Sequence, residues 1–155
     1  MKLCCEVLAA LEGKTLATAE SCTGGGIGAA LTAVPGSSAV YKGGIISYTN
    51  EIKRKLLGVD EHTLAAFGAV SAPVAEAMAD GARKALGADV AVSVTGLAGP
   101  GGDDFGNPVG TVYIGYSDKE ITFSHKYLFP GSREHVRDAA VREALKLVLS
   151  QQAKS

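Results

Sequence analysis

The sequence predicts an α/β protein, a three-layer α/β/α sandwich around a mixed, mostly parallel sheet. Short apolar stretches typical of buried strands alternate along the chain with segments whose apolar residues recur at helical spacing. Two late strand segments are joined only by residues 117–120, and so short a connection requires an antiparallel pair. The length of 155 residues suits one domain spanning 1–155.

Each element rests on local signals in the first half of the chain. Apolar residues at helical spacing indicate the first helix, and Gly- and Ala-rich composition would let the second pack closely on a sheet. Thr49 or Asn50 is the expected cap of the third, and Gly58 its end. The expected elements are helix 2–12, strand 15–19, helix 24–34, strand 40–48 and helix 51–57.

The second half continues the alternation. A short helix is expected from Asp60 or His62 to about Gly68, and Ser71 is the expected cap of the helix that follows. The remaining expected elements are helix 74–86, strand 89–94, a loop over 95–107, strands 109–116 and 121–128, and a long final helix that begins after Ser132.

Composition limits the classes of function. The chain carries 15 Lys and Arg against 16 Asp and Glu, which argues against a broad surface for a nucleic-acid backbone. The N-terminal segment is too short and too charged for a secretory signal, and no long apolar span follows. Three cysteines without CxxC spacing indicate a reducing compartment and no zinc site. We therefore expect a cytoplasmic protein with no nucleic-acid or membrane partner.

The segment AESCTGG at 19–25 lies where an expected strand leads into a glycine-rich helix. Such a turn presents free main-chain N–H groups and the positive end of the helix dipole. Ser21 therefore has two roles open to it: it could cap the helix, or it could attack a carbonyl whose oxyanion these amides receive. Taken alone, capping is the commoner role for a serine at such a position.

A serine nucleophile needs a base. The three histidines lie near expected helix starts or in the middle of a strand, so they give little support to a Ser-His-Asp arrangement. Lys53 offers a serine–lysine scheme if burial or nearby positive charge keeps its amine neutral. Tyr48 and Lys53 stand at the end of a strand and in the next helical turn, which could bring both to one mouth of the sheet. The alternative is a solvated charge run over 53–55.

A second glycine-rich segment, residues 95–102, follows the apolar strand expected at 89–94. Ligands of α/β sheets gather at the carboxyl ends of strands, and such a loop can hold a phosphate through its amides, although it could also be a plain connection. Arg133 and Arg137 could add fixed charge or simply lie on the surface. Residues 24–29 also fit the dinucleotide fingerprint, but no acidic residue ends the next strand to hold a ribose.

Taken together and in order, these segments resemble the CinA C-terminal domain family. The resemblance runs over nearly the whole chain, and several motifs in order are more specific than any one of them. The matching motifs are AESCTGG at 19–25, YxNxxK at 48–53, GAVS at 68–71, MAxG at 78–81, VTGxAGPxG at 94–102, PVGTV at 108–112 and GxRxxVR at 131–137.

The resemblance implies a three-layer α/β/α fold and nicotinamide-nucleotide amidohydrolase activity, a step of pyridine nucleotide salvage. In this reaction nicotinamide mononucleotide and water give nicotinate mononucleotide and ammonia. The resemblance also implies Ser21 as nucleophile with Tyr48 and Lys53 as its partners, and a stand-alone form without the molybdopterin-binding-like domain of longer relatives. One departure is Asn107, where the family usually has a lysine or another residue. If a lysine at this position contacts the ligand in the family, affinity or substrate choice would differ in this chain.

We therefore expect a hydrolase that uses no cofactor or metal, because the pyridinium ring already activates the amide. Its expected partners are a small nucleotide and, at the level of the family, a second copy in a homodimer. Three alternatives stay open: a non-catalytic nucleotide-binding module, a cysteine hydrolase using Cys22, and a dinucleotide-dependent oxidoreductase. The residues expected to bind substrate are Cys22, Thr23, Gly24, Gly25, Asn50, Thr95, Gly96, Gly99, Arg133 and Arg137.

Overall fold

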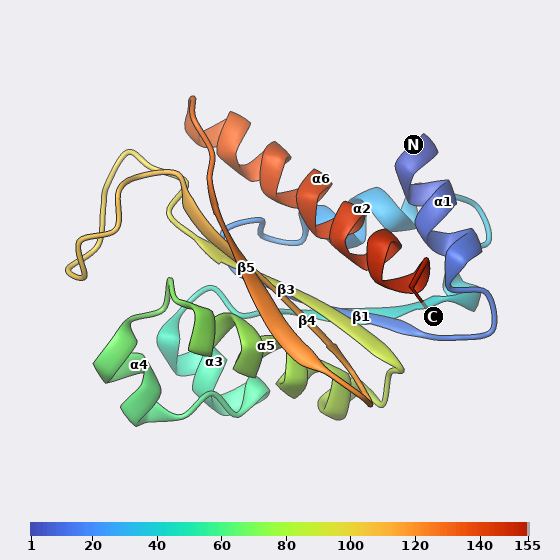
Figure 1. Ribbon diagram of the computed structural model, residues 1–155, viewed down its shortest axis with the longest axis horizontal. Coiled ribbons are helices and arrows are strands. Elements are labelled where there is room, and N and C mark those ends of the chain that lie inside the picture. The colour runs from blue at the N-terminus through green and yellow to red at the C-terminus, as the bar shows by residue number, and fades with distance from the viewer. Residues whose placement is uncertain (155) are drawn as a thin grey trace.

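The computed structural model describes residues 1–154, and its five-stranded sheet lies between two layers of helices (Figure 1). This confirms the three-layer α/β/α fold. One layer holds α1 (Lys2–Ala10), α2 (Gly26–Thr32) and α6 (Arg133–Gln152), and the other holds α3 (Asn50–Leu57), α4 (Glu61–Phe67) and α5 (Ala72–Leu86). A short 3-10 helix (Ser37–Ala39) was not predicted. None of the helices within the described residues is long and apolar enough to cross a bilayer.

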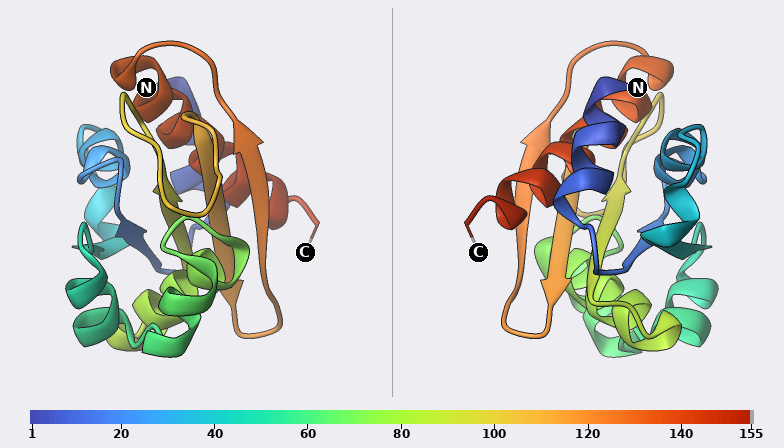
Figure 2. Two further views of the ribbon diagram at one scale, coloured as in Figure 1. Left: turned by 90° about the vertical axis from the view of Figure 1, so that its left-hand side faces the viewer. Right: turned by 90° about the vertical axis from the view of Figure 1, so that its right-hand side faces the viewer.

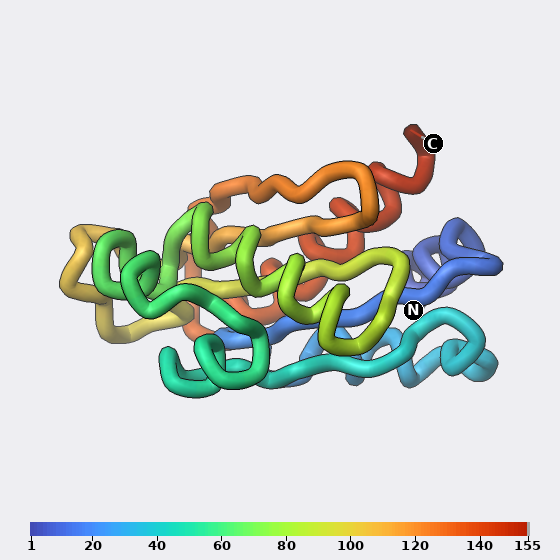
Figure 3. The backbone as a smooth tube through the Cα atoms, turned by 90° about the horizontal axis from the view of Figure 1, so that it is seen from below, coloured from blue at the N-terminus to red at the C-terminus, as the bar shows by residue number. Residues whose placement is uncertain are grey.

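The sheet is mixed, as predicted. Its strands are β1 (Leu16–Glu20), β2 (Tyr41–Ile46), β3 (Val90–Gly96), β4 (Thr111–Asp118) and β5 (Thr122–Leu128). They lie side by side in the order β2-β1-β3-β4-β5 (Figure 3). β1 pairs in parallel with β2 and β3, while β4 is antiparallel to both β3 and β5, so only β4 runs against the others. The carboxyl ends of β1, β2 and β3 therefore meet at one end of the sheet.

The apolar core lies on both faces of the sheet. Because successive side chains of a strand point to opposite faces, Val90 and Val92 pack with the core of α1, α2 and α6, whereas Ala91 packs with that of α5. All five residues of β1 are buried, as expected for a central parallel strand covered on both faces. The buried central strands therefore fix the positions of the residues that follow their carboxyl ends.

Helix boundaries mostly follow the predicted cap chemistry. Thr49 Oγ1 accepts from the amide of Ile52 at 3.4 Å and starts α3, and Gly58 ends the helix with φ 70°. Ser71 precedes α5 as expected, but its hydroxyl donates to the carbonyl of Gly68 at 2.8 Å rather than capping the helix. That hydroxyl instead closes the turn between α4 and α5.

Helix α3 packs tightly against α5. A Cβ placed on Gly81 would collide with the carbonyl of Leu57, so only glycine allows the two helices to come this close. The chain that follows α3 is hydrogen-bonded to this helix, since the amide of Val59 donates to the carbonyl of Lys53 at 3.1 Å. The helix that carries Lys53 is therefore firmly anchored.

The prediction that a loop begins at Thr95 is wrong. β3 continues to Gly96, because Thr95 and Gly96 still pair with Tyr113 and Val112 of β4. The Thr95 hydroxyl donates to the carbonyl of Ala69 at 2.8 Å, which fixes the strand end to the turn before α5. The glycine-rich loop therefore starts at Leu97, two residues later than the composition indicated.

Candidate active site

The fold brings Ser21 and Lys53 together at the carboxyl end of β1. Ser21 directly follows β1, and Lys53 lies in the first turn of α3, just beyond β2. Because β1 and β2 are neighbouring parallel strands, both side chains reach the same end of the sheet. Lys53 Nζ lies 3.1 Å from Ser21 Oγ. This distance is short enough for direct proton transfer between the two groups.

The surroundings of Lys53 favour its neutral form. The side chain is 1% exposed, and its burial lowers the pKa of the amine from 10.5 to about 8. Its other contacts are to main-chain carbonyls, at 2.7 Å to Ser47 and 3.4 Å to Tyr48. Within residues 1–154 it forms no ion pair with a carboxylate. An amine held in this way can serve as a base near neutral pH.

Tyr48 contacts Lys53 through its main chain and not through its phenol. The side chain is 61% exposed, and its hydroxyl accepts from Arg133 Nη2 at 3.3 Å. Tyr48 follows β2 and lines the same cavity as Ser21. Its role as a partner of Ser21 stays a prediction.

The amides at the start of α2 are already occupied. The carboxylate of Glu20, 2% exposed, accepts from Thr23 Oγ1 at 2.7 Å and from the amides of Ile27, Gly28 and Gly25 at 2.9, 3.0 and 3.2 Å. The expectation that the Gly25 amide receives a substrate oxyanion is therefore corrected. The acidic residue of the AESCTGG motif was not predicted to have a role.

Two amides of the turn after Ser21 stay available. The amide of Gly24 donates to the carbonyl of Ser21 at 3.1 Å and is used internally. Within the described chain the amides of Cys22 and Thr23 donate to no main-chain carbonyl. The Cys22 amide contacts only its own thiol. These two N–H groups, next to the Ser21 hydroxyl along the chain, are the candidates for an oxyanion hole.

Arg137 holds this turn and does not line the cavity. Its Nε donates to the carbonyl of Cys22 at 3.0 Å and its Nη2 to that of Thr23 at 3.4 Å. Because the N–H and C=O of a trans peptide point in opposite directions, the Thr23 amide faces away from the guanidinium. In this structure Arg137 therefore orients main-chain groups of the turn, and its contact with a substrate phosphate stays a prediction.

A cavity of about 310 Å³ opens beside Ser21. The carboxyl ends of β1 and β3, which precede its lining residues, face the viewer in the left panel of Figure 2. Among its lining residues Arg133 carries the only charge, and its Nη1 donates to the carbonyl of Gly99 at 2.6 Å. The cavity is lined by Ser21, Cys22, Tyr48, Arg133 and residues 96–101. It therefore combines a hydroxyl, a glycine-rich wall and one cation held by hydrogen bonds.

Several expected binding residues do not line this cavity. Apart from Thr23, whose main-chain amide is a candidate for the oxyanion hole, they serve the structure around it through the caps, strand pairs and turn contacts given above, or lie on the surface beyond it. These residues are Thr23, Gly24, Gly25, Asn50, Thr95 and Arg137. Cys22, Gly96, Gly99 and Arg133 do line it.

Asn107 fastens the loop between β3 and β4. Its Nδ2 donates to Asp103 at 2.7 Å and to the carbonyl of Val70 at 3.2 Å, and its amide donates to Asp103 at 3.1 Å. Asn107 is not among the residues that line the cavity. The departure from the family pattern at this position therefore affects how the loop is held rather than what the cavity presents.

The Cys22 thiol is a poor candidate nucleophile. Burial raises its pKa from 9.0 to about 11, so the thiol stays protonated near neutral pH. Nearby Arg137 and Lys53 act in the opposite direction but do not offset the desolvation. The hydroxyl of Ser21, beside a buried amine, is the better-activated group.

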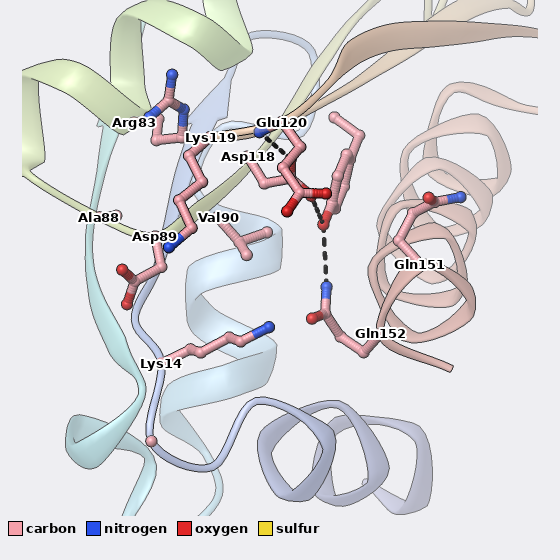
Figure 4. A pocket seen from close by; sticks show the side chains of 12 residues that line it. Lys14, Arg83, Ala88, Asp89, Val90, Asp118, Lys119, Glu120, Gln151 and Gln152 are labelled. Carbon is pink, nitrogen blue, oxygen red and sulfur yellow. Dashed lines mark hydrogen bonds between the residues drawn. The ribbon is translucent and has the colours of Figure 1, made fainter. Parts of the chain in front are cut away.

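A second cavity, of about 410 Å³, lies at the opposite end of the sheet (Figure 4). Lys14, Lys119 and Asp89 stand around it, and the Asp89 carboxylate accepts from the main chain of Thr15 at 2.8 Å. The described residues there pair no serine, threonine or cysteine with a buried amine. Although larger, this cavity offers surface charges with local partners and no activated nucleophile.

Fold and site together define a class of protein: a three-layer α/β/α domain with a buried serine–lysine pair beside a glycine-lined cavity. The sequence matches the CinA C-terminal domain over residues 2–152, and the chain belongs to this family.

Curated relatives include a CinA-like protein of Endomicrobium trichonymphae, 51% identical over 87% of this chain, and one of Mycolicibacterium gilvum, 50% identical over 92%. These matches cover 32% and 34% of the relatives, so the chain spans about a third of their length.

Solved structures share the whole fold. A CinA superfamily protein of Klebsiella pneumoniae 700603 is 36% identical with a TM-score of 0.96, covering 99% of this chain and 98% of that one. A competence/damage inducible protein of Agrobacterium tumefaciens is 41% identical with a TM-score of 0.92, covering 96% and 93%.

Proposed function

We propose that this protein hydrolyses the carboxamide of nicotinamide mononucleotide, with Ser21 as nucleophile and Lys53 as base. The observation that carries the proposal is the 3.1 Å distance between Ser21 Oγ and the buried Lys53 Nζ at the wall of a cavity. The pair supports acyl transfer, and the choice of a pyridine nucleotide rests on the resemblance to the CinA C-terminal domain family.

The proposed reaction has two halves. Neutral Lys53 takes the proton of the Ser21 hydroxyl while the oxygen bonds to the carboxamide carbon, and the amides of Cys22 and Thr23 receive the oxyanion. Lys53 then returns the proton to the leaving nitrogen as the C–N bond breaks, which releases ammonia and leaves an ester on Ser21. In the second half Lys53 takes a proton from water as the water oxygen bonds to the ester carbon, and it returns this proton to Ser21 Oγ as the C–O bond breaks. Nicotinate mononucleotide leaves, and the hydroxyl and the neutral amine are restored.

Arg133 is the proposed anchor for the substrate phosphate. It is the charged side chain of the cavity wall, and the contacts to Gly99 and to the Tyr48 hydroxyl already hold its guanidinium in place. The exposed ring of Tyr48 stands at the same mouth and is proposed to lie against the pyridinium ring. With its phosphate bound at the mouth of the cavity and its carboxamide at Ser21, the substrate would be held in one orientation.

The test is ammonia release from nicotinamide mononucleotide, with nicotinamide riboside as the matched substrate without phosphate. The proposal expects turnover of the nucleotide and a much higher KM for the riboside. Tight calorimetric binding of the nucleotide without ammonia release would favour a non-catalytic binding module instead.

The proposal places the reaction in the cytoplasm and requires no cofactor. Cys4, Cys5 and Cys22 are all free thiols, which supports a reducing compartment. A homodimer stays a prediction from the resemblance alone.

A further inference from the structure

Glu20 is a buried acid that the proposed reaction does not use. Its side chain is 2% exposed, yet it stands in β1 directly before the proposed nucleophile. Burying a carboxylate is costly unless its oxygens are well bonded. The way in which this side chain is satisfied therefore indicates what it does.

Four of the five donors to the carboxylate come from one short segment, residues 23–28, and the fifth, Thr18 Oγ1 of β1, donates to Oε2 at 3.5 Å. Oε1 accepts from Thr23 Oγ1 and from the amides of Gly25 and Ile27, and Oε2 accepts from the amide of Gly28. An ionised carboxylate only accepts, so it matches this set of donors. Glu20 thus satisfies main-chain amides that the start of α2 would otherwise leave without an acceptor.

The main chain of Glu20 reaches the other half of the pair. Its carbonyl accepts from the amide of Ser47 at 2.8 Å, and the carbonyl of Ser47 accepts from Lys53 Nζ at 2.7 Å. Ser21 is the next residue along the chain. One residue therefore connects the turn that carries the nucleophile with the residue that holds the base.

We propose that Glu20 is a positioning residue whose carboxylate fixes the turn bearing Ser21 and the Cys22 and Thr23 amides. This inference rests on the proposed hydrolase function. Among the described residues that line the cavity Arg133 carries the only charge, which is consistent with the proposed orientation of the substrate, with its phosphate toward Arg133 and its amide toward Ser21.

The first test compares Glu20→Gln with Glu76→Gln, a matched change at a half-buried glutamate of α5 that binds the Ser124 hydroxyl at 2.7 Å. Two rates are measured: labelling of Ser21 by a fluorophosphonate probe, followed by mass spectrometry, and ammonia release from nicotinamide mononucleotide. Glu20→Gln is expected to slow both by about 100-fold, as for a misplaced oxyanion hole. Its KM stays within about twofold, because ground-state binding is untouched. Glu76→Gln matches the wild type.

Circular dichroism shows whether Glu20→Gln folds. If it folds poorly, two other variants test the same inference. Thr23→Val removes one donor to the carboxylate and leaves its charge in place, and about a tenfold slower labelling of Ser21 is expected. In Glu20→Ala, added formate should enter the vacated place and restore labelling, whereas chloride should not. A folded Glu20→Gln or Thr23→Val protein that labels at the wild-type rate would overturn the inference.

The outcomes separate this inference from the proposed function. If the wild type releases no ammonia but Ser21 is labelled, and Glu20→Gln slows that labelling, the substrate is wrong and the role of Glu20 stands. If ammonia is released equally by the wild type and Glu20→Gln, the hydrolase stands and the role of Glu20 is overturned. A wild type that neither labels nor turns over contradicts both.

Discussion

The two ends of the sheet differ in what lies buried there. At the carboxyl end an amine and a carboxylate, Lys53 and Glu20, are 1% and 2% exposed, and the amine contacts a serine hydroxyl. At the amino end the cavity is larger, about 410 against 310 Å³, but Lys14, Asp89 and Lys119 around it are exposed. Buried ionisable groups with directed contacts, rather than cavity size, therefore mark the site.

The largest effect is expected from Ser21→Ala. Without the hydroxyl no acyl-enzyme forms, so ammonia release from nicotinamide mononucleotide should fall by at least about 10³-fold. Lys14→Ala at the other end is the control and should match the wild type. A Ser21→Ala protein with wild-type turnover would remove the nucleophile and, with it, the contrast between the two ends.

Stability should also distinguish the two ends. The pKa of Lys53 is about 8 in the folded protein against an ordinary 10.5, so the unfolded chain binds more protons between these values. The free energy of unfolding of the wild type, minus that of Lys53→Met, should therefore rise with pH in this window, by about 1.4 kcal/mol per pH unit. Denaturant unfolding across pH 7 to about 10.5 measures it. For Lys14→Met the same difference in unfolding free energy should not change with pH. A difference for Lys53→Met that does not change with pH would mean that the Lys53 amine is not desolvated.

The pH dependence of catalysis should follow the same group. Because Lys53 must lose its proton to act as base, kcat/KM should rise tenfold per pH unit below about 8 and level off above it, about 90-fold between pH 6 and 9. Initial rates across this range test it. A rate that is already constant from pH 6 upward would rule out Lys53 as the base.

A smaller effect is expected from Arg133→Ala. Loss of the cation should raise KM for nicotinamide mononucleotide by about 10- to 30-fold, the scale of one charged hydrogen bond, with little change in kcat. Lys119→Ala at the amino end serves as the comparison and should leave KM unchanged. An equal KM for the nucleotide with and without Arg133 would move the phosphate site elsewhere.

Much of the fold could be predicted from the sequence because its signals are local. Apolar spacing, Thr49 and Gly58 identified α3, and the short turn after β4 identified an antiparallel pair. The end of β3 could not be predicted, because Thr95 and Gly96 belong to the strand only through their pairing with β4.

The candidate site was predictable in part. The motifs indicated Ser21 and Lys53, but spacing alone left them between capping and a solvated charge run, since their meeting depends on the neighbouring β1 and β2. The orientations of Tyr48 and Arg137 could not be predicted, because each depends on partners far away in the chain. An acid in the otherwise uncharged strand LATAE was a signal for Glu20 that spacing did not explain.

The most direct measurement is mass spectrometry of the protein quenched during turnover of nicotinamide mononucleotide. The account predicts a transient nicotinate-nucleotide ester on the peptide that contains Ser21, absent from Ser21→Ala and from protein quenched after the substrate is exhausted. Ammonia released at the full rate with no adduct on this peptide, and with Ser21→Ala still active, would contradict it.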